Sequence, residues 1–180
     1  MCIRDRAAAA LSAFGVLMTD TCINYQTIMA PIRGDHLAYG DTGVVIYSNS
    51  VCGARSNFEG GPSALAAALT GRTPRYGFHL DSCRRPTRRF RLAAMPRDLS
   101  EWGALGAVIG RACGSYWTVP LVEGVAEIPG SDALKHFGAA LASYGSVARF
   151  EMPGITAEEA EVRAPVSYTH LRAHETGRNL

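Results

Sequence analysis

The chain has 180 residues, with 18 Lys and Arg against 16 Asp and Glu, so its formal net charge is only +2. This small excess of positive charge does not indicate a protein that binds nucleic acid or a membrane surface. The five cysteines are an odd number without CxxC spacing, which argues against a disulfide framework. The length is sufficient for one domain with its own hydrophobic core.

The two ends of the chain differ in character from its interior. MCIRDR at the start and VSYTHLRAHETGRNL at the finish resemble translated sequencing adapters, so we expect residues 1–6 and 166–180 to be artefacts. Charged residues in these two segments account for the whole net charge of +2, and they are Arg4, Asp5, Arg6, Arg172, Glu175 and Arg178. The interior is therefore electroneutral, and we expect no nucleic-acid partner.

The first apolar run, AAAALSAFGVLM at residues 7–18, is shorter than the roughly 20 apolar residues that span a bilayer. It leads into Thr19, Asp20 and Thr21 without a small-residue cleavage site, so we interpret it as a helix and not as a secretory signal. Because no other run is long enough to span a bilayer, we expect a cytoplasmic protein with no membrane partner.

Residues 41–61, DTGVVIYSNSVCGARSNFEGG, form the segment richest in reactive and hydrogen-bonding side chains. The β-branched and aromatic residues at 44–47 predict a buried strand. The run at 62–71 predicts a helix, with Pro62 in its first turn and Gly71 at its C-terminal cap. Ligand sites in open α/β sheets lie beyond the carboxyl ends of strands, and helix N-termini attract anions. Arg55 and the turn before the helix thus form a candidate carboxylate or phosphate site, or else a tight turn with satisfied polar groups.

The rest of the chain alternates between expected strands and expected helices. We predict strands at residues 76–80, 89–95, 116–124 and 146–152, and helices at residues 98–113 and 131–145. Asp98 and Glu101 have capping-box spacing, and Gly145 suits the end of the last helix. Glycines at 103, 106 and 110 would let one helix face pack close to a neighbour. This order predicts a layered α/β architecture with at least partly parallel strands.

One basic run follows the expected strand at 76–80 and extends into the one at 89–95, and it is formed by Arg84, Arg85, Arg88, Arg89 and Arg91. It can be read as a phosphate or RNA patch, or as a means of attracting an anionic substrate. Neither stacking aromatics nor a nucleic-acid motif accompanies it. We therefore interpret the run as a solvated strand edge or a subunit contact.

Several segments carry a resemblance to a known family. They are MTDTCINYQ at 18–26, GDHLAYGDTGVVIYSNSVCGARSNFEGGPSALAAALTGRTPRYGFHLD at 34–81 and, more loosely, WTVPLVEG at 117–124 and FEMPGIT at 150–156. These segments resemble the aconitase X family. The resemblance implies an incomplete aconitase-like α/β catalytic domain over residues 7–165, about half of a family catalytic subunit. It also implies a swivelling small subunit or domain as a partner.

The activity implied by the resemblance is that of a hydro-lyase, a dehydratase that removes water from a small hydroxylated carboxylic acid with the help of an iron or iron–sulfur centre. The Cys in SNSVCGAR is similar to the bacterial type, which favours cis-3-hydroxy-L-proline as the substrate. Phosphomevalonate is the alternative substrate. The alternative class is a non-enzymatic one, an inactive iron-binding or structural α/β fragment.

The resemblance also assigns roles to residues of this chain. Cys22 and Cys52 are the implied metal ligands, although their spacing alone would indicate two buried thiols. The implied contacts to the substrate carboxylate and hydroxyl are Asn49, Ser50, Arg55, Ser56 and Asn57. His79 and Asp81 flank a predicted strand end and are second-tier candidates for acid–base catalysis, since a lone His there is more often structural. Glu151 stands where we would expect a His.

Overall fold

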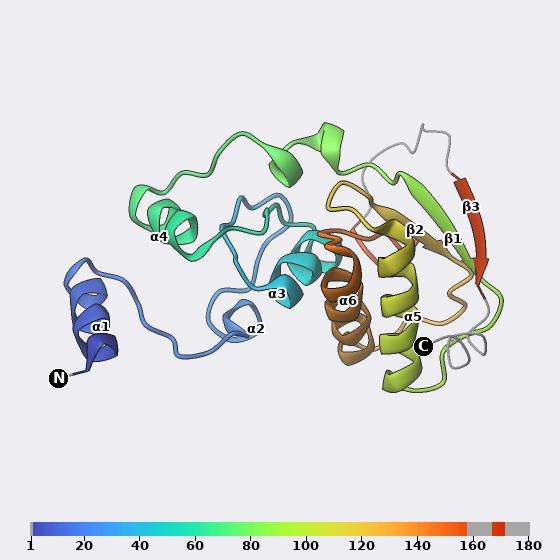
Figure 1. Ribbon diagram of the computed structural model, residues 1–180, viewed down its shortest axis with the longest axis horizontal. Coiled ribbons are helices and arrows are strands. Elements are labelled where there is room, and N and C mark those ends of the chain that lie inside the picture. Colours follow the sequence, from blue (N-terminus) through green and yellow to red (C-terminus); the bar gives the residue numbers. More distant parts are fainter. Residues whose placement is uncertain (1, 158–166, 172–180) are drawn as a thin grey trace.

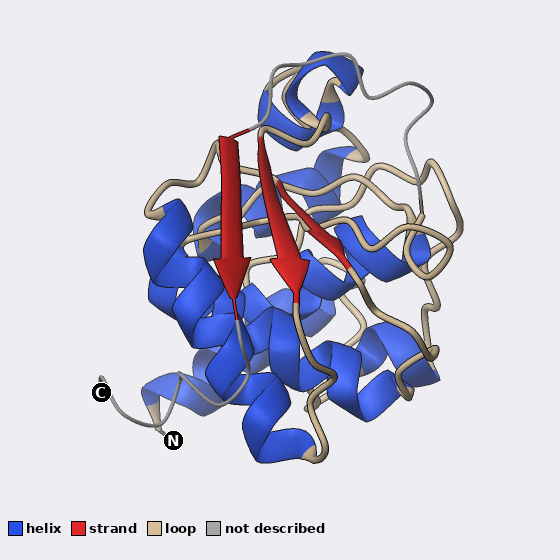
Figure 2. Cartoon of the chain, turned by 90° about the vertical axis from the view of Figure 1, so that its right-hand side faces the viewer, coloured by secondary structure: helices blue, strands red, loops and turns tan. Residues whose placement is uncertain are grey.

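The structure is a computed structural model that describes residues 2–157 and the backbone of residues 167–171 (Figure 1). Its C-terminal half contains a three-stranded parallel sheet in the order β2-β1-β3. The strands are β1 (Arg88–Leu92), β2 (Pro120–Glu123) and β3 (Ser167–Leu171). In Figure 2 the strands lie in front and most helices behind them. The expected α/β architecture with parallel strands is confirmed.

Two helices, α5 (Leu99–Cys113) and α6 (Ser131–Gly145), pack side by side against the sheet (Figure 1). The side chain of Asp98 accepts a hydrogen bond from the Glu101 backbone N–H and starts α5, as predicted. Glycine is required where the helices meet, because a Cβ on Gly106 would lie 2.4 Å from the carbonyl oxygen of Phe137. The left-handed cap of α6 is Ser146, with φ 57°, so the predicted cap at Gly145 is wrong by one residue.

The main hydrophobic core lies between the sheet and these helices. Phe137 of α6 contacts Trp102 of α5 at 6.0 Å between ring centroids and Phe150 at 5.0 Å. Ile46, far earlier in the chain, is fully buried in the same cluster. The core therefore ties the segment at 41–61 to the α/β half.

The predicted strand at 44–47 is wrong. These residues form the helix α3 (Thr42–Tyr47), which continues into the π-helical turn η1 (Ser48–Cys52). The Asp41 side chain accepts a hydrogen bond from the Val44 N–H at 3.1 Å and caps the helix. The β-branched side chains that predicted a strand are all buried. Ile46 lies in the main core with residues of α6, and Val45 lies in a second cluster with Phe78, Val119 and Ala148, so tertiary packing overrides their β-propensity.

The other predictions have mixed outcomes. The helix at 62–71 is confirmed as α4 (Gly61–Thr70), with Gly71 at φ 64° as its cap. The strands at 89–95 and 116–124 are confirmed as β1 and β2. Residues 76–80 are not a strand but contain the 3-10 turn η2 (Gly77–His79), and a second 3-10 turn, η3 (Asp81–Cys83), follows directly. Residues 146–152 form only one bridge, between Leu121 and Glu151.

The N-terminal part forms an extended arm (Figure 1). It contains α1 (Ile3–Ala13) and α2 (Asn24–Thr27), and neither α1 nor α4 has a buried residue. No helix within residues 2–157 is long and apolar enough to cross a membrane. β3 lies in the segment that we expect to be an artefact, and that expectation stays a prediction.

Candidate functional site

A cavity of about 630 Å³ opens beside η2 and η3. Its lining residues come from loops that are distant in the sequence, and they are Gly34, His36, Arg55, Thr73, Pro74, Arg75, His79, Leu80 and Asp81. Two backbone hydrogen bonds hold the first two loops together, from Leu37 N–H to the Arg55 carbonyl and from Arg55 N–H to the Asp35 carbonyl, each 2.8 Å. This pairing places His36 beside Arg55.

Two histidines face each other at the cavity. The Nδ1 atoms of His36 and His79 are 2.9 Å apart, and the rings stack with 5.1 Å between centroids and 17° between planes. His79 is buried, whereas His36 is exposed. Burial, and then the neighbouring His36, lower the pKa of His79, against a smaller opposing effect of Glu59. His79 is therefore neutral at neutral pH.

The hydrogen bond between the rings determines where their protons sit. Nε2 of His79 is buried and has no hydrogen-bond partner among the described residues. A buried N–H without a partner is costly, so the favoured tautomer of His79 carries its proton on Nδ1 and donates it to His36. Neutral His36 then carries its own proton on Nε2. The pair thus combines a buried acceptor nitrogen, Nε2 of His79, with the exposed ring of His36.

Arg55 joins the two histidine-bearing loops and carries a positive charge into the cavity. It donates to the carbonyl oxygen of His79 at 2.9 Å and forms an ion pair with Asp81. The hydrogen bond and charge of Arg55 lower the pKa of the Asp81 carboxyl, which stays ionised at neutral pH. The Asp81 side chain is 76% exposed, so an incoming carboxylate or phosphate can compete with it for Arg55. Arg75 supplies a second guanidinium to the lining.

Asn49, Ser50 and Ser56 are fully buried. The Asn49 amide nitrogen donates to the carbonyls of Ser56 at 2.8 Å and Ala148 at 2.9 Å, and its oxygen accepts from the Ser56 N–H at 2.9 Å. The Ser50 hydroxyl accepts from the Phe150 N–H at 2.9 Å. These groups bind the loop after η1 to the rest of the protein.

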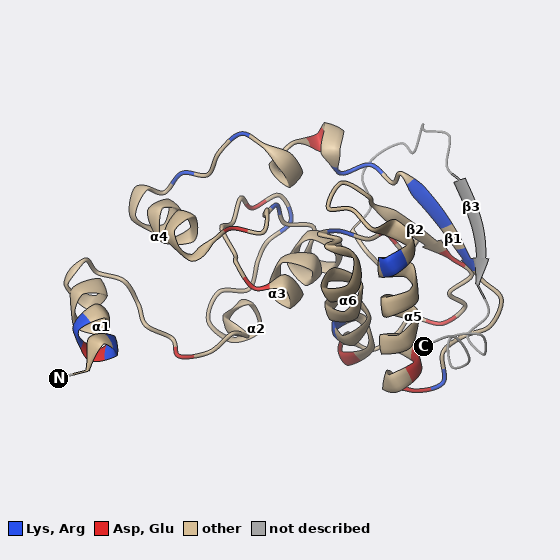
Figure 3. Cartoon of the chain, viewed as in Figure 1, with Lys and Arg blue, Asp and Glu red and all other residues tan. Residues whose placement is uncertain are grey.

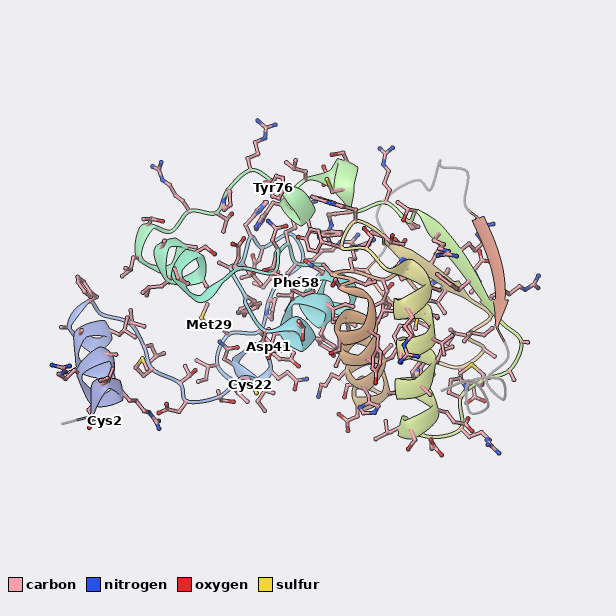
Figure 4. All side chains as sticks on the ribbon, in the orientation of Figure 1. Cys2, Cys22, Met29, Asp41, Phe58 and Tyr76 are labelled. Carbon is pink, nitrogen blue, oxygen red and sulfur yellow. The ribbon has the colours of Figure 1, made fainter. Side chains whose placement is uncertain are left out.

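Asn57 ties the same loop to η2. Its side-chain oxygen accepts from the Phe78 N–H at 2.9 Å and from the Tyr116 hydroxyl at 2.7 Å, and its nitrogen donates to the Tyr76 carbonyl at 3.2 Å. Figure 4 labels Phe58 and Tyr76 on the two segments that this side chain joins. Of the five residues predicted to bind the substrate, Arg55 is the one that lines the cavity. Substrate contact by the other four stays a prediction.

The two predicted metal ligands lie near one tyrosine. The pKa of Tyr25 is raised first by burial and further by neighbouring groups that include Cys52 and Cys22. Cys22 is exposed, on the segment leading into α2 (Figure 4), and Cys52 is half-buried, with its pKa raised by burial. No group of three or more His, Cys, Asp or Glu residues within the described chain is placed to hold a metal ion. Cys22 and Cys52 could therefore supply at most two thiolate ligands to an iron centre.

The sequence prediction missed His36 and Arg75, although both belong to the segment 34–81 that carries the resemblance. His36 gave no spacing signal because 43 residues separate it from His79. Its position in the cavity follows from the backbone pairing with Arg55, which no local pattern predicts.

Comparisons with known proteins agree with this architecture. A family model described as "Aconitase X first domain" matches residues 3–82, and one described as "Aconitase X second domain" matches residues 86–176. The crystal structure of Thermococcus kodakaraensis aconitase X in its holo-form superposes with a TM-score of 0.85 at 31% identity. That match covers 97% of this chain and 45% of the solved chain.

Relatives of known activity come from two groups. A phosphomevalonate dehydratase large subunit from Methanothermobacter thermautotrophicus is 44% identical over 156 residues, covering 87% of this chain and 38% of the relative. A cis-3-hydroxy-L-proline dehydratase from Hypocrea jecorina is 36% identical over 163 residues, covering 88% of this chain and 27% of the relative. The chain thus spans about two fifths or less of these relatives.

Proposed function

The chain belongs to the aconitase X family, and we propose that it forms part of the large subunit of a dehydratase whose substrate is phosphomevalonate. The phosphomevalonate dehydratase relative is 44% identical, against 36% for the hydroxyproline enzyme. These identities favour the alternative substrate over the one that the SNSVCGAR motif suggested. Cis-3-hydroxy-L-proline is the second candidate, and Cys52 is the observation that favours it.

The observation that carries the proposal is the joint presence of two guanidiniums and a hydrogen-bonded histidine pair in one cavity. Arg55 and Arg75 provide positive charge for a phosphate or carboxylate group. Asp81 holds Arg55 until a substrate anion takes its place. In this proposal Arg55 binds the substrate, and Asp81 orients Arg55 without transferring a proton.

Dehydration removes a proton from carbon and a hydroxyl from the neighbouring carbon. We assign proton transfer to His36 and His79, because a neutral pair joined through Nδ1 can take up one proton and release it again. Burial lowers the pKa of His79, and its Nδ1 accepts the hydrogen bond when the shared proton lies on Nδ1 of His36. In that second tautomer Nε2 of the exposed His36 is free, so this atom takes up the proton from the cavity, while His79 carries its own proton on Nε2.

An iron or iron–sulfur centre, when bound, would supply a Lewis acid for the departing hydroxyl. Cys22 and Cys52 would contribute two of its ligands, and the others would come from outside the described residues. The name of the relatives, large subunit, supports a small-subunit partner for the complete protein. We propose that this partner is the swivelling small subunit or domain of the family.

The test is a pair of assays on the complete large subunit, combined with its small subunit and reconstituted with iron without oxygen. Phosphomevalonate and cis-3-hydroxy-L-proline are supplied separately, and loss of water is followed by mass spectrometry. We expect turnover of phosphomevalonate and at least about tenfold lower kcat/KM for the hydroxyproline. Preference for the hydroxyproline would replace this proposal with the second candidate.

A further inference from the structure

Arg84 is a charged residue in the protein interior, where most side chains are apolar. It is fully buried, whereas its neighbour Arg85 is exposed. Its guanidinium donates to the carbonyl oxygens of Phe78 and Asn49, each at 3.1 Å. Placing a guanidinium inside a protein is costly unless it is well hydrogen-bonded, so these contacts have to hold the side chain in one geometry.

The main chain of Arg84 is held from the other side by a second buried arginine. Arg149, also fully buried, donates to the Arg84 carbonyl and, at 2.9 Å, to the Ala157 carbonyl. Its charge is balanced by Glu151 at 2.9 Å. The backbone of Arg84 is therefore fixed to Arg149, whereas its side chain is fixed to η1 and η2.

These contacts converge on His79. The carbonyl before it, that of Phe78, accepts from Arg84, and its own carbonyl accepts from Arg55. Arg84 also holds Asn49, whose amide fixes Ser56 next to Arg55 in the sequence. One buried guanidinium thus connects the loop that carries Arg55 with the turn that carries His79.

We propose that Arg84 is a positioning residue of the cavity, which holds the Phe78–His79 peptide and the loop after η1 so that His79 faces His36. The expected effect on kcat rests on the proposed function. The expected effect on the position of His79 does not depend on the substrate. A positioning role predicts that lysine, which keeps only the positive charge, cannot replace Arg84, because the planar guanidinium of Arg84 reaches two carbonyls at once.

The experiment compares Arg84→Lys and Arg84→Met with the matched exposed controls Arg85→Lys and Arg85→Met in the complete enzyme. We expect both Arg84 variants to lower kcat by at least about tenfold with KM changed less than about threefold, and the controls to match the wild type. The same proteins are titrated by NMR through the imidazole signals of His79. We expect its pKa to rise in both Arg84 variants. In Arg84→Met the lost positive charge of Arg84 also raises this pKa, so Arg84→Lys, which keeps the charge beside His36, Glu59 and Arg55, reports the relaxed burial alone.

Several outcomes would overturn the inference. One is a folded Arg84→Lys variant with wild-type kcat and an unchanged His79 titration. Another is failure of both Arg84 variants to fold by circular dichroism, which would make Arg84 a folding determinant. If the wild type dehydrates neither substrate while the His79 titration moves only in the Arg84 variants, the proposed function fails and the positioning role stands.

Discussion

His36 and His79 share one hydrogen bond between their Nδ1 atoms, 2.9 Å apart, although they differ in exposure. Two protonated imidazoles at this distance would repel each other, so the pair takes up one proton at a time. Under the proposed function the exposed ring exchanges that proton with the cavity and the buried ring sets the geometry, so the two loop residues act as one functional unit.

Replacing either member of the pair should therefore remove most of the proton transfer. We expect His36→Gln and His79→Gln each to lower kcat of the complete enzyme by about 10² to 10⁴. The double variant should be little worse than the single ones, because the residues act together. His136→Gln is the control, since His136 lies in a separate groove between α5 and α6. Additive losses in the double variant would show that the histidines act separately.

The buried state of His79 also makes stability depend on pH. Its pKa is lowered in the folded protein, so the unfolded chain binds more protons below about pH 6.5. The free energy of unfolding should fall as the pH drops below that value, and His79→Gln should reduce this loss. Urea unfolding at pH 7 and pH 5 measures it. Equal slopes in wild type and variant would contradict the prediction.

Arg55 should be sensitive even to a change that keeps its charge. Arg55→Lys cannot hold the His79 carbonyl and a substrate anion with one planar fork, so we expect kcat/KM to fall by about 10² to 10³. Arg85→Lys is the control because Arg85 is exposed and does not line the cavity. An Arg55→Lys enzyme within about twofold of the wild type would make Arg55 a purely structural residue.

The cysteines should separate into two groups. We expect Cys22→Ala and Cys52→Ala each to lower the iron content of the complete, anaerobically reconstituted enzyme. Cys113→Ala should leave it unchanged, because Cys113 lies at the end of α5, outside the segments that carry the family resemblance. Iron content and the visible absorption spectrum report the result. Full iron content in Cys52→Ala would remove Cys52 from the ligand set.

The contact between α5 and α6 predicts a stability effect unrelated to the cavity. A Cβ at Gly106 would lie 2.4 Å from the Phe137 carbonyl oxygen, so Gly106→Ala should lower the free energy of unfolding by about 1 to 3 kcal/mol. Gly61→Ala is the control, since a Cβ at Gly61 meets nothing within 4 Å. Urea denaturation measures both variants. Equal midpoints would mean that the helices move apart without cost.

The sequence predicted the elements whose ends carry their own signals. Asp98 before α5 and Gly71 after α4 are local caps, and both are in place. The strand at 44–47 failed because Val45 and Ile46 are buried in two tertiary clusters, and β-propensity contains no information about those contacts. Arg55 and His79 were both candidates from the sequence. His36 was missed because its position depends on backbone pairing between loops, and local patterns carry no information about that pairing.

The arm and the α/β half should also differ in how readily their amides exchange with deuterated solvent. Residues of α1 bury no side chain, so local opening there costs little and exchange should be complete early. In α5 and α6 the backbones approach so closely that a Cβ at Gly145 would lie 2.1 Å from the Gly110 carbonyl oxygen. Opening either helix separates both, and we expect their central amides to exchange last. We therefore expect the contact between Gly110 and Gly145 to mark the most slowly exchanging unit of the described chain.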